Sequence, residues 1–237
     1  MSNVLWQEMQ LETLSSSGYK VVGIDLRGCG CNEETTEEVT SIEQLLDDLE
    51  RIVKREATGR TVHLWGWCLG GVIAINLHFH SPSLVQSLVL SAPSIFPQRH
   101  LVERAAQMGA HPQDETVETI LPLAIHEDDF TKSPALEEFI LKDDKRRKTT
   151  TSCFYRIQKK MCQYAWFKVQ AKKLEAPVYL ILAARDVVVD NEWTQRIFSP
   201  LENCQIKMIE SEHGIQFERA AELSESLSWW FSRYDGS

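Results

Sequence analysis

The segment Gly66-Trp67-Cys68-Leu69-Gly70-Gly71 places a cysteine between an apolar run and the glycine-rich start of a helical pattern. In such a strand–turn–helix context a nucleophile sits in a strained turn, with its side chain pointing out of the sheet. The helix packs tightly on the strand, so small residues are needed on both sides, and Gly66 and Gly70 meet that need. The helix start directs backbone N–H groups at Cys68 and favours a thiolate. We therefore expect Cys68 to be a nucleophile and the Leu69 N–H to stabilise an oxyanion.

An aspartate and a histidine that lie much later in the chain complete a triad in the order nucleophile, acid, histidine. Asp186 follows the apolar run 178–184, and His213 follows the run 205–210. A histidine can take the proton of the thiol, and an acid can orient its imidazole ring. Asp190 lies one short turn beyond Asp186 and is the alternative acid. We predict Asp186, because it leaves the end of its strand directly.

Each of these residues also has an ordinary structural explanation. A buried cysteine is often a small core residue, Asp186 could cap a helix, and His213 could be a surface loop histidine. A phosphate-binding loop is a weaker alternative than a buried cysteine, because no Lys-Ser/Thr pair follows the glycines. The spacing Cys29-x-Cys31 is wrong for a zinc knuckle and no second pair follows, so neither a metal nor a cofactor is expected. The combination of turn, acid and histidine favours the catalytic interpretation.

Alternating apolar runs and amphipathic segments must position these side chains. The pattern predicts an α/β fold, with a mostly parallel sheet covered by helices on both faces. Ligands of such sheets bind at the carboxyl ends of the strands. Strands are expected at residues 19–26, 61–67, 85–91, 177–184 and 205–210, and helices at 4–16, 41–56, 69–80, 192–198 and 217–231.

The segment 97–174 interrupts the alternation with helical patterns and no convincing strand. We expect it to form a helical cap over the strand ends. Its aromatic residues Trp166 and Phe167, together with Trp67 beside the nucleophile, are the candidate substrate-binding residues. This aromatic face would suit an acyl chain, although ordinary helix packing explains it equally well. The expected organisation is a core in two parts, residues 1–96 and 175–237, with the cap at 97–174 between them.

Bulk composition narrows the possible partners. The chain has 237 residues, 43% of them hydrophobic, and a formal net charge of −9. An acidic surface repels phosphate backbones, so no nucleic acid partner is expected. No apolar run is long enough to span a membrane, and neither an export signal in Met1–Gln10 nor a dense cysteine framework is present, which favours a cytoplasmic protein with reduced thiols. We expect a small-molecule acyl ester or thioester as substrate, free or carrier-bound.

A family resemblance extends over most of the chain. The segments Gly18–Gly28, Gly66–Gly71, Leu88–Pro93, Pro177–Asp186 and Glu212–Gly214 resemble α/β-hydrolases of the monoglyceride lipase and lysophospholipase group. The resemblance implies an α/β-hydrolase fold with a cap, and acyl chemistry at the nucleophile turn. That turn, with its cysteine, is also similar to the turn of polyhydroxyalkanoate synthases, but the chain is too short for that group.

Two departures from the family pattern bear on function. Lipase-like members carry serine where this chain has Cys68, and cysteine is the better nucleophile toward thioesters and in acyl transfer. The family also has strands and a His-Gly oxyanion loop before the first helix, and Met1–Gln10 contains no such loop. We therefore expect a fold that lacks the first strands, or a chain start placed too late.

Three hypotheses remain open from the sequence. The leading one is an acyl hydrolase or acyltransferase that works through an acyl-enzyme on Cys68. The second is a catalytically weak or inactive binding protein of the same fold, without the oxyanion loop. The third is a carboxylesterase or lipase that acts on lipid-like esters.

Overall fold

The computed structural model describes residues 8–26, 42–95 and 174–235. Within these residues lies one parallel sheet of four strands in the order β1-β2-β3-β4. The strands are β1 (Val62–Trp67), β2 (Val85–Ser91), β3 (Val178–Ala183) and β4 (Cys204–Ile209). Spatial order follows chain order, and the register pairs Val178 of β3 with Leu88 of β2 and Cys204 of β4.

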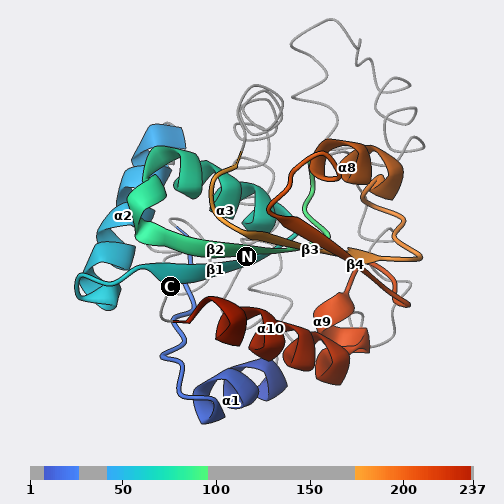
Figure 1. Ribbon diagram of the computed structural model, residues 1–237, viewed down its shortest axis with the longest axis horizontal. Helices are drawn as coiled ribbons and strands as arrows, with labels where there is room; N and C mark the ends of the chain where they lie inside the picture. Colours follow the sequence, from blue (N-terminus) through green and yellow to red (C-terminus); the bar gives the residue numbers. More distant parts are fainter. Residues whose placement is uncertain (1–7, 27–41, 96–173, 236–237) are drawn as a thin grey trace, which may run out of the picture.

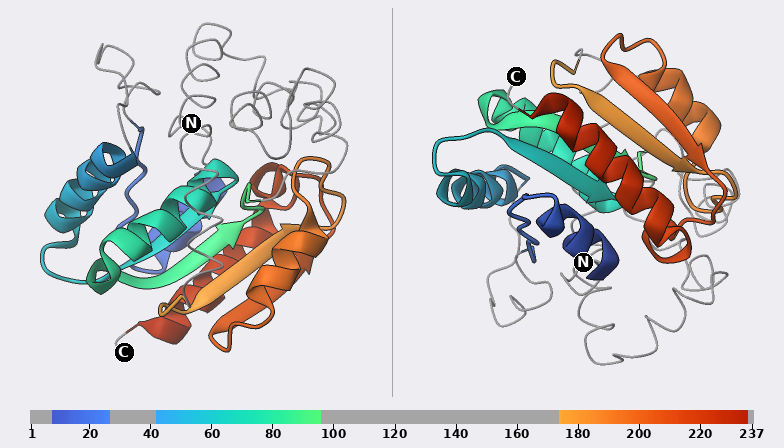
Figure 2. Two further views of the ribbon diagram at one scale, coloured as in Figure 1. Left: turned by 90° about the horizontal axis from the view of Figure 1, so that it is seen from above. Right: turned by 60° about the horizontal axis from the view of Figure 1, so that its bottom comes forward.

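Helices cover both faces of this sheet (Figures 1 and 2). One face carries α2 (Ile42–Ala57), α3 (Leu69–His80) and α8 (Asn191–Phe198). The other carries α1 (Glu8–Ser16), α9 (Ile215–Glu218) and α10 (Ala220–Tyr234). A short 3₁₀ turn, η3 (Pro82–Leu84), leads from α3 into β2. The α/β architecture predicted from the alternating pattern is confirmed.

The core lies where the two inner strands are covered on both sides. Every residue of β3 is buried, and six of the seven residues of β2 are buried as well. A continuous run of apolar residues is expected for parallel strands that meet helices on both faces. Helix α2 contributes an apolar stripe of Leu45, Leu46, Leu49 and Val53, as its 3.6-residue period predicts. None of the helices within residues 8–26, 42–95 and 174–235 is long and apolar enough to span a membrane.

Most predicted elements occur within one or two residues of their expected bounds, but two predictions were wrong. The helix expected at 217–231 is two helices, because the chain breaks at Arg219, whose φ of −130° is outside the helical region. The strand expected at 19–26 is irregular backbone. Residues 18–24 and β1 line one cavity of about 830 Å³, and the described sheet, β1 to β4, contains no strand from residues 19–26.

The glycines of the turn after β1 are needed at different places than predicted. A Cβ atom on Gly66 would lie 2.2 Å from the Gly70 carbonyl oxygen, and one on Gly71 would lie 2.9 Å from Pro93 Cβ. A Cβ atom on Gly70 would meet nothing within 4 Å. The expectation that Gly70 must be small was therefore wrong. The tight contacts between β1, α3 and the end of β2 depend on Gly66 and Gly71.

This difference predicts opposite outcomes for two matched substitutions. Gly66→Ala should lower the free energy of unfolding by about 3 kcal/mol, because backbone atoms must shift to admit the methyl group. Gly70→Ala should change it by no more than about 1 kcal/mol, with a tendency to stabilise, since alanine is the better helix former. Urea unfolding followed by circular dichroism measures both values. Equal destabilisation by the two variants would contradict this account of the turn.

Candidate active site

Cys68 occupies a strained turn between β1 and α3. Its φ is 52° and its ψ is −119°, a left-handed backbone conformation that non-glycine residues rarely adopt. The peptide groups on both sides are held, because the Cys68 N–H donates to the Ser91 carbonyl at 2.9 Å and the Cys68 carbonyl accepts from the N–H of Ser94 at 3.2 Å. Backbone strain of this kind persists only where the surroundings enforce it, and it gathers at functional sites. The turn predicted for the nucleophile is present.

Asp186 and His213 form a buried pair beside this turn. Nδ1 of His213 lies 2.8 Å from Oδ2 of Asp186, and the side chains are 2% and 0% exposed. A carboxylate only accepts hydrogen bonds, so Nδ1 carries the proton and donates it. The second oxygen of Asp186, Oδ1, accepts from the backbone N–H groups of Val188 at 2.8 Å and Val189 at 2.9 Å. The sequence predicts that Asp186 contacts the ring of His213, and this contact is present. The catalytic role of the pair stays a prediction.

Asp190, the alternative acid, has a different role, which is to cap a helix. It is the N-cap of α8, and its Oδ1 accepts the backbone N–H of Trp193 at 3.0 Å. A side-chain oxygen at this position satisfies one of the N–H groups that the first turn of a helix leaves without an intrahelical partner. Asp190 therefore stabilises α8, and of the two aspartates it is Asp186 that contacts the imidazole.

The charges around His213 favour its protonated form. Burial by itself lowers the pKa of the imidazole, but the negative charge of Asp186 and that of Cys68 outweigh burial and raise this pKa above its ordinary value. A cysteine beside a protonated histidine is one arrangement that activates a thiol nucleophile.

Two further contacts bear on the loop between β4 and α9, which carries His213. The Glu212 N–H donates to Oε2 of Glu218 at 3.0 Å, and Nε of Arg219 donates to the Glu210 carbonyl at 2.8 Å. The sequence did not indicate these roles of Glu218 and Arg219. Both lie at the break between α9 and α10, and no local pattern in the sequence indicates that break.

Trp67 has a contact that the sequence did not indicate. Its indole Nε1–H donates to the backbone carbonyl of His213 at 2.9 Å, and the residue is 6% exposed. The proposed role of Trp67 in binding substrate stays a prediction. Leu69 is the first residue of α3, so its N–H belongs to the helix start next to Cys68. Trp166, Phe167 and the cap at 97–174 lie outside the described residues, apart from Leu174, which is buried.

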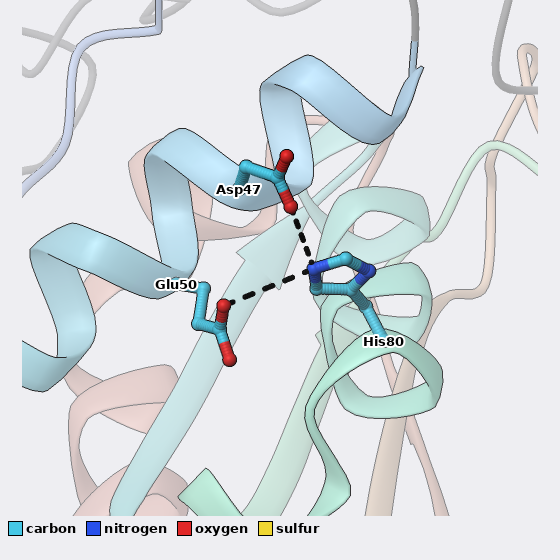
Figure 3. Close-up of side chains that lie close together, drawn as sticks. All are labelled: Asp47, Glu50 and His80. Carbon is cyan, nitrogen blue, oxygen red and sulfur yellow. Dashed lines mark ion pairs between the residues drawn. The ribbon is translucent and has the colours of Figure 1, made fainter.

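Among the described residues, one group of three side chains brings possible metal ligands within 4.8 Å of one another: Asp47, Glu50 and His80. They lie between α2 and the far end of α3 (Figure 3). Nε2 of His80 is 3.1 Å from Asp47 and 4.0 Å from Glu50, and Glu50 also pairs with Lys54 at 2.8 Å. Ordinary ion pairs account for this arrangement. The cavity of about 830 Å³ beside β1 is a separate feature. Cys68, Asp186 and His213 are not among the residues that line it.

Comparison with known proteins shows the family to which the chain belongs. The family model described as serine aminopeptidase, S33 (Hydrolase_4) matches residues 5–220. A protein named as carbamate hydrolase RutD from Variovorax paradoxus (strain S110) is 33% identical over 113 residues, which are 46% of this chain and 42% of that protein. A protein of Arabidopsis thaliana named as lysophospholipase BODYGUARD 4 is 27% identical over 96 residues, 40% of this chain and 23% of that protein.

Solved structures extend the likeness over the whole chain. The crystal structure of a protein named as non-heme bromoperoxidase BpoC from Mycobacterium tuberculosis H37Rv superposes with a TM-score of 0.74 and 20% identity, covering 100% of this chain and 90% of that one. At this identity the likeness shows the fold. The matches to the two curated relatives span less than half of the length of each. Because the family model covers nearly the full length, this chain belongs to the Hydrolase_4 family, serine aminopeptidase, S33, of the α/β-hydrolase superfamily.

Proposed function

We propose that the protein hydrolyses an ester or thioester, or transfers its acyl group, through an acyl-enzyme on Cys68. The observation that carries this proposal is the hydrogen-bonded pair Asp186–His213 beside a cysteine held at a positive φ. Negative charge beside His213 raises the pKa of its imidazole, and a cysteine next to a protonated histidine is an activated nucleophile. The names of two relatives, a carbamate hydrolase and a lysophospholipase, support cleavage of an acyl group from oxygen or nitrogen.

The reaction begins with the proton of Cys68 on Nε2 of His213. The thiolate attacks the carbonyl carbon, a carbon–sulfur bond forms, and the carbonyl oxygen becomes an oxyanion near the N–H of Leu69. The bond to the leaving oxygen or sulfur then breaks, and His213 protonates the leaving group. Water gives a proton to His213 and attacks the acyl group, and Cys68 leaves again as a thiolate. An acceptor alcohol or thiol in place of water gives acyl transfer.

A binding protein without catalytic activity is the second candidate. The observation that favours it is the burial of Cys68, which is 1% exposed. One oxyanion donor, the N–H of Leu69, is assigned, whereas active sites of this type use at least two. Turnover of a short-chain p-nitrophenyl ester or of an acyl thioester distinguishes the candidates, because a binding protein releases no product above the level of a Cys68→Ala variant.

The first prediction concerns thiol reactivity. Cys68 should be the thiol that iodoacetamide modifies fastest in the folded protein, because His213 stabilises its thiolate. His213→Ala should slow this modification at pH 7 by about tenfold, since an ordinary thiol with a pKa near 8.5 is mostly protonated there. Cys204 is an internal control, because burial raises the pKa of its thiol to about 12 and keeps it protonated. Peptide mapping by mass spectrometry identifies the modified site, and faster reaction of Cys29 or Cys153 would refute the assignment.

The second prediction separates the two aspartates. In Asp186→Asn the amide oxygen can keep the bonds from Val188 and Val189, so the amide N–H faces Nδ1 of His213. The proton of the imidazole then sits on Nε2, and the ring cannot accept the proton of Cys68. We expect kcat to fall by at least about a hundredfold.

Asp190→Asn is the matched control for that variant. Asparagine is as good an N-cap as aspartate, so kcat and the melting temperature should both stay close to those of the parent protein. Steady-state kinetics on any substrate that the parent protein turns over measures both variants. A larger loss in Asp190→Asn than in Asp186→Asn would reassign the acid.

The third prediction concerns the leaving group. A thiolate that attacks an oxygen ester must expel an alkoxide, which leaves less readily than the thiolate itself, so the intermediate tends to return to reactants. With a thioester the two sulfur leaving groups are comparable. For the same acyl chain, kcat/KM should be at least about tenfold higher for the thioester than for an unactivated oxygen ester.

Cys68→Ser is the matched variant for this comparison and should shift the preference toward the oxygen ester. The idea is refuted if the parent protein prefers the unactivated oxygen ester. It is equally refuted if the serine variant shows the same preference as the parent. Absence of turnover in both proteins would support the non-catalytic candidate.

A further inference from the structure

One hydrogen bond joins the strand of the nucleophile to the loop of the base. Trp67 is the last residue of β1, and its side chain reaches the His213 carbonyl, which belongs to the loop after β4. Strands β2 and β3 lie between these two elements. Neighbouring strands are about 4.8 Å apart, so β1 and β4 are separated by about 14 Å. A tryptophan side chain is shorter than this separation, so the loop that carries His213 must turn back across the end of the sheet to meet the indole N–H.

The indole ring also packs against the ring that it helps to hold. The ring centroids of Trp67 and His213 are 5.2 Å apart with an interplanar angle of 44°. On another side Trp67 meets the ring of Phe217 edge-on, at 6.4 Å and 83°. Asp186 holds His213 at Nδ1, and Trp67 holds the same residue at its backbone carbonyl and ring face. The imidazole is thus fixed from two sides, and one of the two supports is covalently next to Cys68.

We propose that Trp67 is a positioning residue that sets the separation between Cys68 and His213 through its hydrogen bond to the His213 carbonyl. The proposal rests on the proposed function of the site. Because Trp67 directly precedes Cys68, any shift of the loop after β4 relative to the turn must break or bend this bond. The productive distance between sulfur and imidazole therefore depends on the indole N–H.

The chain offers a matched control two residues earlier on the same strand. Trp65 also donates its indole N–H, at 3.0 Å, but to Oγ of Ser91 on the neighbouring strand β2. Residues two apart on a strand point to the same face. Trp65→Phe and Trp67→Phe thus remove the same group from the same side of β1, and the indole N–H of Trp67 donates to His213 whereas that of Trp65 donates to Ser91.

The test measures the rate of Cys68 modification by iodoacetamide between pH 5 and 10, together with the melting temperature. Trp67→Phe should lower the rate at pH 7 by about tenfold, since small misplacement of reacting groups has large effects. It should also move the midpoint of the pH profile upward, toward that of an ordinary thiol. Trp65→Phe should keep the parent rate and midpoint, although both variants lower the melting temperature.

The same substitution in a His213→Ala protein shows whether Trp67 affects the reactivity of Cys68 by way of His213. In a His213→Ala protein, Trp67→Phe should cause no further loss of reactivity, because the group that it positions is already absent. If Trp67→Phe proves not to fold, benzothienylalanine at position 67 replaces the indole N–H by sulfur in the same shape and must give the same loss.

Two results would overturn the proposal. One is a Trp67→Phe protein with the parent rate and pH midpoint, which would make Trp67 a core residue only. The other is an equal loss in Trp65→Phe. Failure of the proposed function looks different, because His213→Ala alone would then leave the reactivity of Cys68 unchanged.

Discussion

The carboxyl end of the sheet depends on a buried carboxylate that satisfies its hydrogen bonds locally. Asp186 is held by the N–H groups of Val188 and Val189 on one oxygen and by His213 on the other. A buried charge without such partners is strongly destabilising, and removing one partner of a buried pair costs about 3–5 kcal/mol. The loops after β3 and β4 are therefore anchored to each other by the same groups that orient the imidazole. Stability and catalytic geometry share one interaction here.

Cys68 meets a different constraint, because it comes from the opposite edge of the described sheet. It follows β1, whereas Asp186 and His213 follow β3 and β4. The turn is fixed by its bonds to Ser91 and Ser94 and by the close approach of Gly66 to Gly70. The backbone of β2 thus places the cysteine, and the loops beyond β3 and β4 place its partners. A parallel sheet makes this possible because all its strands end on the same side.

Local chemistry explains which parts could be predicted from the sequence. The strands at 85–91 and 205–210 and the turn at Cys68 follow from apolar runs and small residues, which are local signals. The choice of Asp186 over Asp190 also had a local signal, since an aspartate that accepts N–H groups two and three residues later is a common turn former. The turn at Cys68 and the contact between Asp186 and His213 occur as predicted, and their catalytic roles stay a prediction.

The predictions that failed depended on contacts between distant segments. Residues 19–26 have a strand-like composition, but a strand also needs a neighbour that pairs with it, and this segment is irregular backbone that lines one cavity of about 830 Å³ together with β1. The crowding at Gly71 comes from Pro93, and the bond of Trp67 goes to a residue 146 positions away. No window of sequence contains both members of such pairs. Composition identified the residue types, and the three-dimensional contacts decided which of them mattered.

The burial of Cys68 also affects the rate at which its thiol is oxidised. A thiolate is oxidised by peroxide first to sulfenic acid and then irreversibly to sulfinic and sulfonic acids, at a rate that follows both its charge and its exposure. At 1% exposure, Cys68 has little contact with bulk water. Low exposure slows every reagent that must reach the sulfur, peroxide and iodoacetamide alike, so fast modification of Cys68 requires local opening of the residues around it. A serine in the same turn would not be subject to this series of oxidations.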